Sequence, residues 1–263
     1  MLRGADTGGT MIRSLLSCLL MLQVLLFSLQ VATVQARADA ATEYQIQTFP
    51  LERNGIALHL QRLAVAGTQP QRQILLVHGL TYSSHEFDVN YADYSLARYL
   101  AARGFAVWTF DVAGYGDSQE VEDGFMPNSD YAAEDAAAAA AEILKVSGQK
   151  KLDVLGWSWG TVTSSRFVAR HPEMVKKLVL YAPIMVGLGA AEVKVPFNHN
   201  TWLHAAGDFQ TTKDGAIDYS IVDPPGVAVF QSTCWRYDKD SSPHGGRRDR
   251  LVSAETPLLD PAS

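Results

Sequence analysis

The chain has 263 residues, of which 47% are hydrophobic, and it carries a formal net charge of −6 at neutral pH. That length suffices for one domain with a sizeable core, and the acidic balance argues against nucleic acid as a partner. The sequence holds only two cysteines, Cys18 and Cys234, which excludes a small secreted scaffold that depends on several disulfides.

The first 38 residues have the three parts of a secretory signal peptide. A positively charged start precedes an apolar run at residues 15–34, and residues 36–38 read Ala-Arg-Ala, a small-x-small cleavage site. We therefore expect cleavage after Ala38, export to the periplasm or the cell exterior, and no stable membrane span in the mature chain. The alternative is an uncleaved membrane anchor, because the apolar run approaches the length that spans a bilayer.

Strand and helix signals then alternate along the chain. Strands are expected at residues 44–51, 56–63, 73–77, 105–110, 152–155 and 177–182, and helices at residues 91–103, 129–146 and 161–169. Asn54-Gly55 between the first two apolar runs predicts a β-hairpin, and Ser129 or Asp130 is the expected cap of the second helix. The alternation predicts a mostly parallel, doubly wound α/β sheet.

A Gly-Trp-Ser-Trp-Gly turn at residues 156–160 stands between a predicted strand and a predicted helix. Strand, tight turn and helix in this order are the context of a nucleophile elbow, which would hold Ser158 at its apex. Gly156 and Gly160 fit such a turn, because positions two before and two after the serine have little room for a β-carbon. The alternative is an ordinary glycine-rich turn with a solvent-exposed serine.

A second glycine-rich turn, at residues 111–118, has the composition of a phosphate cradle but not its spacing. It lacks the G-x-G-x-x-G pattern, and no helix signal follows it directly, so we interpret it as structural. We expect no cofactor and no metal ion from the sequence.

Four pieces of the sequence together resemble the α/β-hydrolase superfamily, in its serine esterase and lipase branch. They are LLVHGL at 75–80, DVAGYGDS at 111–118, GWSWG at 156–160 and LVLYAP at 178–183. The resemblance implies an α/β-hydrolase fold in which Ser158 is the nucleophile and the backbone N–H groups of Leu80 and Trp159 form an oxyanion hole. It also implies that His78 is a structural residue of its loop and not the catalytic base.

The resemblance weakens towards the end of the sequence. Members of the superfamily carry two more strands after a lid, one followed by the acid and the other by the base histidine, whereas this sequence stops at Ser263. His244 and Asp260 are the late candidates for base and acid, and both fit those places poorly. The expected divisions are a signal peptide at 1–38, an α/β-hydrolase core at 39–186, a lid inserted after the sixth strand at 187–250, and a truncated start of the C-terminal part of the core at 251–263.

The leading hypothesis is an exported carboxylic ester hydrolase that acts on small apolar ester or acyl substrates, because two tryptophans flank Ser158. A serine hydroxyl needs a neutral imidazole to take its proton and an acid to orient that imidazole, so we expect the chain as given to be at most a weak catalyst. Two alternatives stay open. One is a peptidase similar to proline iminopeptidases, although residues 78–81 do not match their His-Gly-Gly-Pro loop, and the other is a truncated or non-catalytic protein on the same fold.

The signal-peptide hypothesis predicts that residues 1–38 are removed on export. N-terminal sequencing of the protein recovered from the cell envelope or the medium should therefore begin at Asp39. A mature chain that still begins at Met1 would support the uncleaved anchor instead.

Overall fold

The computed structural model describes residues 42–80, 82–184, 197–199, 207, 209, 211–236 and 251–253. The expected signal peptide, His244 and Asp260 lie outside these ranges. Side chains are described for neither of the short segments at 197–199 and 251–253. Within the described ranges, no helix is both long enough and apolar enough to cross a membrane.

Six strands form one mixed sheet in the order β1-β2-β4-β3-β5-β6. Their bounds are β1 Tyr44–Arg53, β2 Ile56–Val65, β3 Arg72–Val77, β4 Phe105–Phe110, β5 Leu152–Trp157 and β6 Val175–Tyr181. The β1–β2 and β2–β4 pairs are antiparallel, and the three remaining pairs are parallel. The predicted doubly wound α/β sheet is therefore confirmed, and β2 is the one strand of this sheet that runs against the others.

The helices begin and end at the following residues: η1 Ser84–Phe87, α2 Leu96–Ala101, α3 Ser129–Ser147, α4 Trp159–Arg170 and α6 Pro224–Arg236. Two short strands, β7 Phe197–His199 and β8 Leu251–Ser253, pair antiparallel in a second sheet. The segment at 251–253 thus pairs with β7, while the expected division of the chain at residues 187 and 251 stays a prediction.

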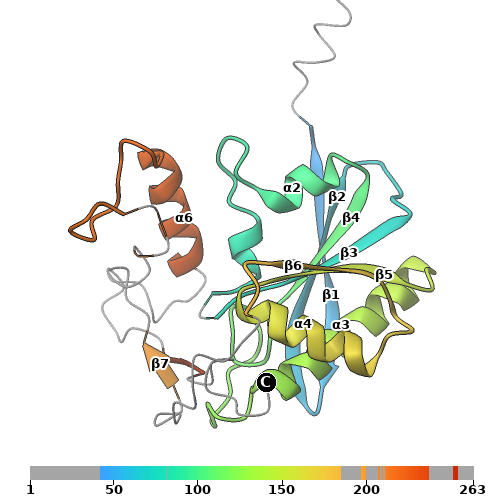
Figure 1. Ribbon diagram of the computed structural model, residues 1–263. Helices are drawn as coiled ribbons and strands as arrows, with labels where there is room; N and C mark the ends of the chain where they lie inside the picture. The colour runs from blue at the N-terminus through green and yellow to red at the C-terminus, as the bar shows by residue number, and fades with distance from the viewer. Residues whose placement is uncertain are drawn as a thin grey trace, which may run out of the picture. The chain divides into compact units, whose positions relative to one another are not determined.

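Helices cover both faces of the six-stranded sheet (Figure 1), and the alternation of side chains along β3 explains how. Leu75 and Val77 belong to the core cluster beneath α3 and α4, whereas Ile74 and Leu76 belong to the cluster beneath α2. Successive side chains of a strand point to opposite faces, so a continuous apolar strand needs a cover on each side. Six of the nine buried residues of α3 are alanines.

The β1–β2 hairpin agrees with its predicted turn. Asn54 and Gly55 have φ angles of 53° and 78°, and positive φ at both central residues is the requirement of the two-residue turn that matches the twist of paired strands. The turn therefore sets a register in which Tyr44 pairs with Val65 and Arg53 with Ile56.

Two helix starts differ from the predictions. The helix expected at 91–103 begins at Leu96, where the Ser95 hydroxyl accepts the Arg98 N–H at 3.0 Å. The cap of α3 is Asn128, whose side chain accepts the Tyr131 N–H at 2.9 Å. The prediction of Ser129 or Asp130 was therefore wrong.

The two residues predicted as the α3 cap have other partners. The Ser129 hydroxyl accepts the indole N–H of Trp159 at 3.1 Å, and the Asp130 carboxylate pairs with Arg166 at 2.7 Å. Both contacts tie α3 to α4. Capping preference alone cannot distinguish neighbouring Asn, Ser and Asp residues, because all three are favoured at this position.

Candidate functional site

Ser158 lies between the end of β5 and the start of α4, in a backbone conformation that side chains rarely adopt. Its φ and ψ angles are 52° and −120°, a strained region that persists only where the surroundings hold it. Its N–H donates to the carbonyl of Tyr181 at 3.1 Å, and its carbonyl accepts both the N–H and the hydroxyl of Thr161. Hydrogen bonds on both sides of the residue therefore fix the turn.

The two glycines of the turn are required by close backbone contacts. A β-carbon at Gly156 would collide with the carbonyl of Gly160, and one at Gly160 would collide with the carbonyl of Val77 at the end of β3. The turn is thus packed on its own helix and on the neighbouring strand, as the sequence predicts for Gly156 and Gly160.

The loop after β3 reaches Ser158 through Gly79. A β-carbon at Gly79 would lie 2.8 Å from the Trp157 ring and 3.2 Å from the Ser158 β-carbon. The Gly79 N–H donates to the Glu86 carboxylate at 3.0 Å, which anchors this loop to η1. The residue that follows, Leu80, therefore lies in the loop that borders the serine.

The backbone N–H groups of Leu80 and Trp159 have no hydrogen-bond acceptor among the described residues. For Trp159 this follows from its position, because the first N–H groups of a helix have no partner within the helix. These are the two groups that the resemblance implies for an oxyanion hole.

His78 is fully buried, and backbone groups contact both of its ring nitrogens. Nε2 accepts the Val112 N–H at 3.2 Å, so the proton lies on Nδ1, which faces the Gly79 carbonyl at 3.0 Å. Burial lowers the pKa of this imidazole, while the negative charge of Asp111 and the Gly79 carbonyl act in the opposite direction. A neutral ring with both nitrogens engaged fits a structural residue and not a base.

An aromatic cluster borders the turn. The Tyr82 ring lies 5.7 Å from the Trp157 ring and 5.8 Å from the Phe230 ring of α6, and Phe209 packs edge-on against Phe230. Buried Cys234 belongs to the same cluster. The part of α6 that the sequence assigns to a lid therefore packs beside the elbow through apolar side chains.

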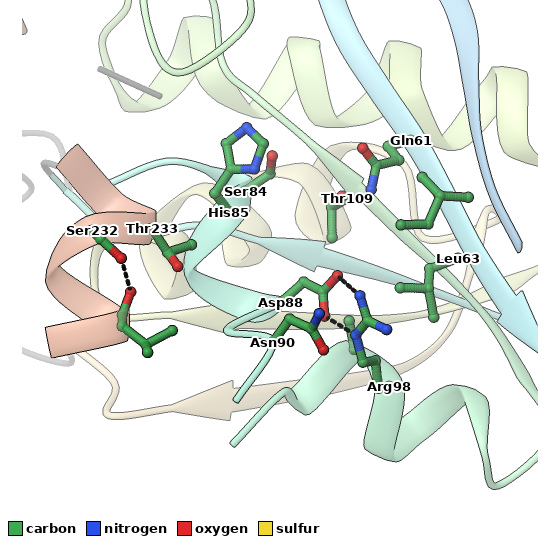
Figure 2. A pocket seen from close by; sticks show the side chains of 13 residues that line it. Gln61, Leu63, Ser84, His85, Asp88, Asn90, Arg98, Thr109, Ser232 and Thr233 are labelled. Carbon is green, nitrogen blue, oxygen red and sulfur yellow. Dashed lines mark hydrogen bonds and ion pairs between the residues drawn. The ribbon is translucent and has the colours of Figure 1, made fainter. Parts of the chain in front are cut away.

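A separate pocket of about 450 Å³ lies between η1, α2, the β2–β4 strands and α6. Figure 2 shows polar side chains around it, including the Asp88 carboxylate facing the Arg98 guanidinium, with a 2.7 Å contact. Ser158 does not line this pocket. We therefore place the candidate active site at the elbow and not at this pocket.

Asp111 organises the glycine-rich turn at 111–118. Its buried carboxylate accepts the N–H of Ser84 at 2.6 Å and that of Asp117 at 2.9 Å. Gly116 has a φ of 51°, and a β-carbon there would collide with the same carboxylate. These contacts support the structural interpretation of the turn. The sequence did not single out Asp111, because its hydrogen-bond partners are backbone groups of two different loops.

A family model described as the alpha/beta hydrolase fold matches residues 73–217, more than half of the chain. The chain belongs to the α/β-hydrolase family. The matched range contains the β3 loop, the glycine-rich turn and the nucleophile elbow, so the motifs that carried the resemblance lie within it.

The chain is similar in sequence to several proteins that are named as hydrolases. The uncharacterized carboxylesterase nap of Bacillus subtilis is 28% identical over 74% of this chain and 63% of its own. The human serine hydrolase BPHL is 28% identical over 62% of this chain and 52% of its own length. Human lipase member M is 28% identical over 57% of this chain and 38% of its own length. The chain thus spans between about two fifths and just under two thirds of the length of these relatives.

Solved structures similar to this chain include a predicted hydrolase from Thermoplasma acidophilum, with a TM-score of 0.42, 22% identity, and coverage of 52% of this chain and 63% of that one. Another is epoxide hydrolase VrEH1 from Vigna radiata, with a TM-score of 0.45, 20% identity, and coverage of 54% and 39%.

The close packing of the elbow predicts that Gly160→Ala is strongly destabilising. The new β-carbon meets backbone carbonyls of β3 that cannot rotate away, and overpacking of this kind costs about 1–3 kcal/mol. Urea unfolding should place the variant at the upper end of that range. Gly207→Ala is the matched control, because a β-carbon there meets no atom of the described residues within 4 Å, and an equal loss in both variants would contradict the packing argument.

Burial of neutral His78 predicts that stability falls with acidity. Because the folded-state pKa is lowered, the unfolded chain takes up a proton below about pH 6.5 that the folded chain does not, and the free energy of unfolding decreases as the pH falls through that window. Urea unfolding between about pH 5 and pH 8 should show this slope. His78→Gln should make this slope shallower by up to about one proton, and an unchanged slope in that variant would contradict the role of His78.

Proposed function

We propose that this α/β hydrolase cleaves carboxylic esters through an acyl-enzyme formed on Ser158. The observation that carries the proposal is the strained, doubly anchored backbone of Ser158 at the junction of β5 and α4. An enzyme maintains such strain where it presents a side chain for chemistry. The names of its relatives, a carboxylesterase, a serine hydrolase and a lipase, support the same class of reaction.

In the proposed reaction, the Ser158 hydroxyl oxygen attacks the ester carbonyl, and the carbonyl oxygen becomes an oxyanion. The N–H groups of Leu80 and Trp159 border the serine and lack acceptors among the described residues, so they are suited to stabilise that charge. Collapse of the tetrahedral intermediate releases the alcohol, and water then releases the carboxylic acid by the same steps.

The serine proton must pass to a base, which we do not assign to a described histidine. His78 is held by backbone groups on both nitrogens. The rings of His59 and His85 stack on each other, and His171 contacts Glu134. The candidates that the sequence provides, His244 as base and Asp260 as acid, lie outside the described residues, and we propose them for these roles.

The surroundings of the serine favour an apolar acyl group. Trp157, Tyr82 and Phe230 present aromatic rings beside the turn, and the partly buried Leu80 packs against the core. An acyl chain that contacts these rings would gain roughly 25 cal/mol for each Å² of apolar surface removed from water. We therefore propose esters of apolar acids over those of charged acids.

The proposal predicts that a fluorophosphonate probe labels Ser158. Mass spectrometry of the labelled protein should place the adduct on the peptide that contains Trp157 and Trp159. Ser158→Ala should abolish that labelling and reduce to background the weak p-nitrophenyl ester turnover expected of the chain, because the serine, base and acid act as one unit.

Ser164→Ala is the matched control for this experiment. Ser164 lies one and a half turns along α4, buried, and its hydroxyl has no hydrogen-bond partner among the described residues. Its removal should therefore leave both the fold and the labelling unchanged. An adduct that survives in Ser158→Ala, or ester turnover that this variant retains, would sink the assignment and favour a non-catalytic protein on the hydrolase fold.

A further inference from the structure

Three potential metal ligands converge beside the glycine-rich turn. His59 comes from β2, Asp111 follows β4, and Asp117 lies six residues further along the turn. One ligand atom from each of them lies within 4.8 Å of the other two. The fold brings His59 of β2 to the turn that holds both aspartates.

The two carboxylates are held in place by other groups. Each Asp111 oxygen accepts one backbone N–H, from Ser84 at 2.6 Å and from Asp117 at 2.9 Å, and each retains a further lone pair. The Asp117 carboxylate faces Nε2 of His85 at 2.7 Å. Hydrogen bonds that orient ligating side chains in this way are a regular part of metal sites.

The third ligand, His59, has a nitrogen that the protein leaves without a hydrogen bond. Its Nε2 is shielded from solvent and has no hydrogen-bond partner in the part of the chain that the structure describes. A buried polar atom without a partner destabilises the folded state, because it has lost its hydrogen bonds to water without replacement. A metal ion bound to this nitrogen would remove that destabilisation.

We propose that His59, Asp111 and Asp117 bind a divalent transition-metal ion, with Zn²⁺ as the best match. Imidazole nitrogen favours zinc over magnesium or calcium, and carboxylate oxygens complete its usual ligand set. Bonds of about 2 Å to a tetrahedral ion place ligand atoms about 3.3 Å apart, so the three atoms must approach one another. The Asp117 side chain, 39% exposed, has room to do so.

Solvent reaches the proposed site through a cavity of about 540 Å³ beside the β1–β2 hairpin, and both His59 and Asp117 line it. The cavity provides an entry path for the ion and space for a water molecule as the fourth ligand. The sequence led us to expect no metal, because ligands at positions 59, 111 and 117 form none of the short spacings by which zinc sites are recognised.

The ion would have a structural effect that reaches the elbow. It would join β2 to the glycine-rich turn, and Asp111 already holds Ser84 at the start of η1. Glu86 of η1 in turn holds the Gly79 N–H in the loop beside Ser158. Metal binding would therefore stiffen the loop that carries Leu80, independently of whether the serine is catalytic.

The test is titration of the tag-free chain with ZnCl₂ by isothermal calorimetry after dialysis against a chelator. We expect one ion per chain and a zinc-dependent rise in the midpoint of thermal unfolding, because an ion that binds only the folded state stabilises it. His59→Gln and Asp117→Asn should each weaken binding by on the order of 100-fold, and MgCl₂ at the same concentration should not compete.

The matched control is His171→Gln. This histidine lies 3.3 Å from Glu134 and 3.7 Å from Glu173, so it is an imidazole among carboxylates outside the proposed site, and its loss should leave zinc affinity unchanged. Near-ultraviolet circular dichroism without metal checks that the variants fold. If His59→Gln does not fold, the zinc affinity of Asp117→Asn decides between the outcomes. Absence of stoichiometric binding, or binding that survives Asp117→Asn, would overturn the proposal.

Discussion

The contact between α4 and the end of β3 constrains most of what surrounds the candidate site. Gly160 lies so close to the Val77 carbonyl that no side chain fits between them. The helix can approach this closely only if the chain reverses within a single residue after β5, and Ser158 is that residue. Its positive φ makes that reversal possible, and the hydrogen bonds to Tyr181 and Thr161 hold it there.

A second set of contacts fixes the loops at the same end of the sheet. Buried carboxylates do this by accepting hydrogen bonds from backbone N–H groups. Such hydrogen bonds are charge-assisted and therefore stronger than those between neutral groups. Asp111 joins η1 to the glycine-rich turn, and Asp135 joins Ala113 to Arg53 of β1. Burial raises the pKa of Asp135, while the Ala113 N–H and the Arg53 guanidinium act against that rise. Loops anchored in this way can position N–H groups with little side-chain involvement.

The sequence was a good guide wherever local chemistry decides the structure. Asn54-Gly55 required one kind of turn, and the apolar run of β3 required a cover on both faces; both predictions are confirmed. The start of α2 was wrong because apolar spacing continues into residues 91–95, which instead form turns ahead of the Ser95 cap. Residue spacing alone is compatible with either helix or turn in such a segment, and tertiary contacts select between them.

The same distinction between local and long-range contacts separates the elbow from the proposed metal site. The elbow was readable because Gly156, Ser158 and Gly160 are neighbours in sequence, whereas His59, Asp111 and Asp117 meet only through the pairing of β2 with β4. The assignments of base and acid to His244 and Asp260 stay predictions. They depend on contacts between distant segments, and no spacing rule supplies those.

The tryptophans beside Ser158 give the molecule a built-in optical reporter. The Trp159 indole is fully buried and donates to Ser129, while Trp157 is half-buried against Tyr82. Emission from an indole depends on its exposure to water, so one fluorophore senses the packing of α3 on α4 and the other senses the aromatic surface where a ligand would arrive. Intrinsic fluorescence therefore includes a signal from the elbow, alongside the emission of Trp108, Trp202 and Trp235.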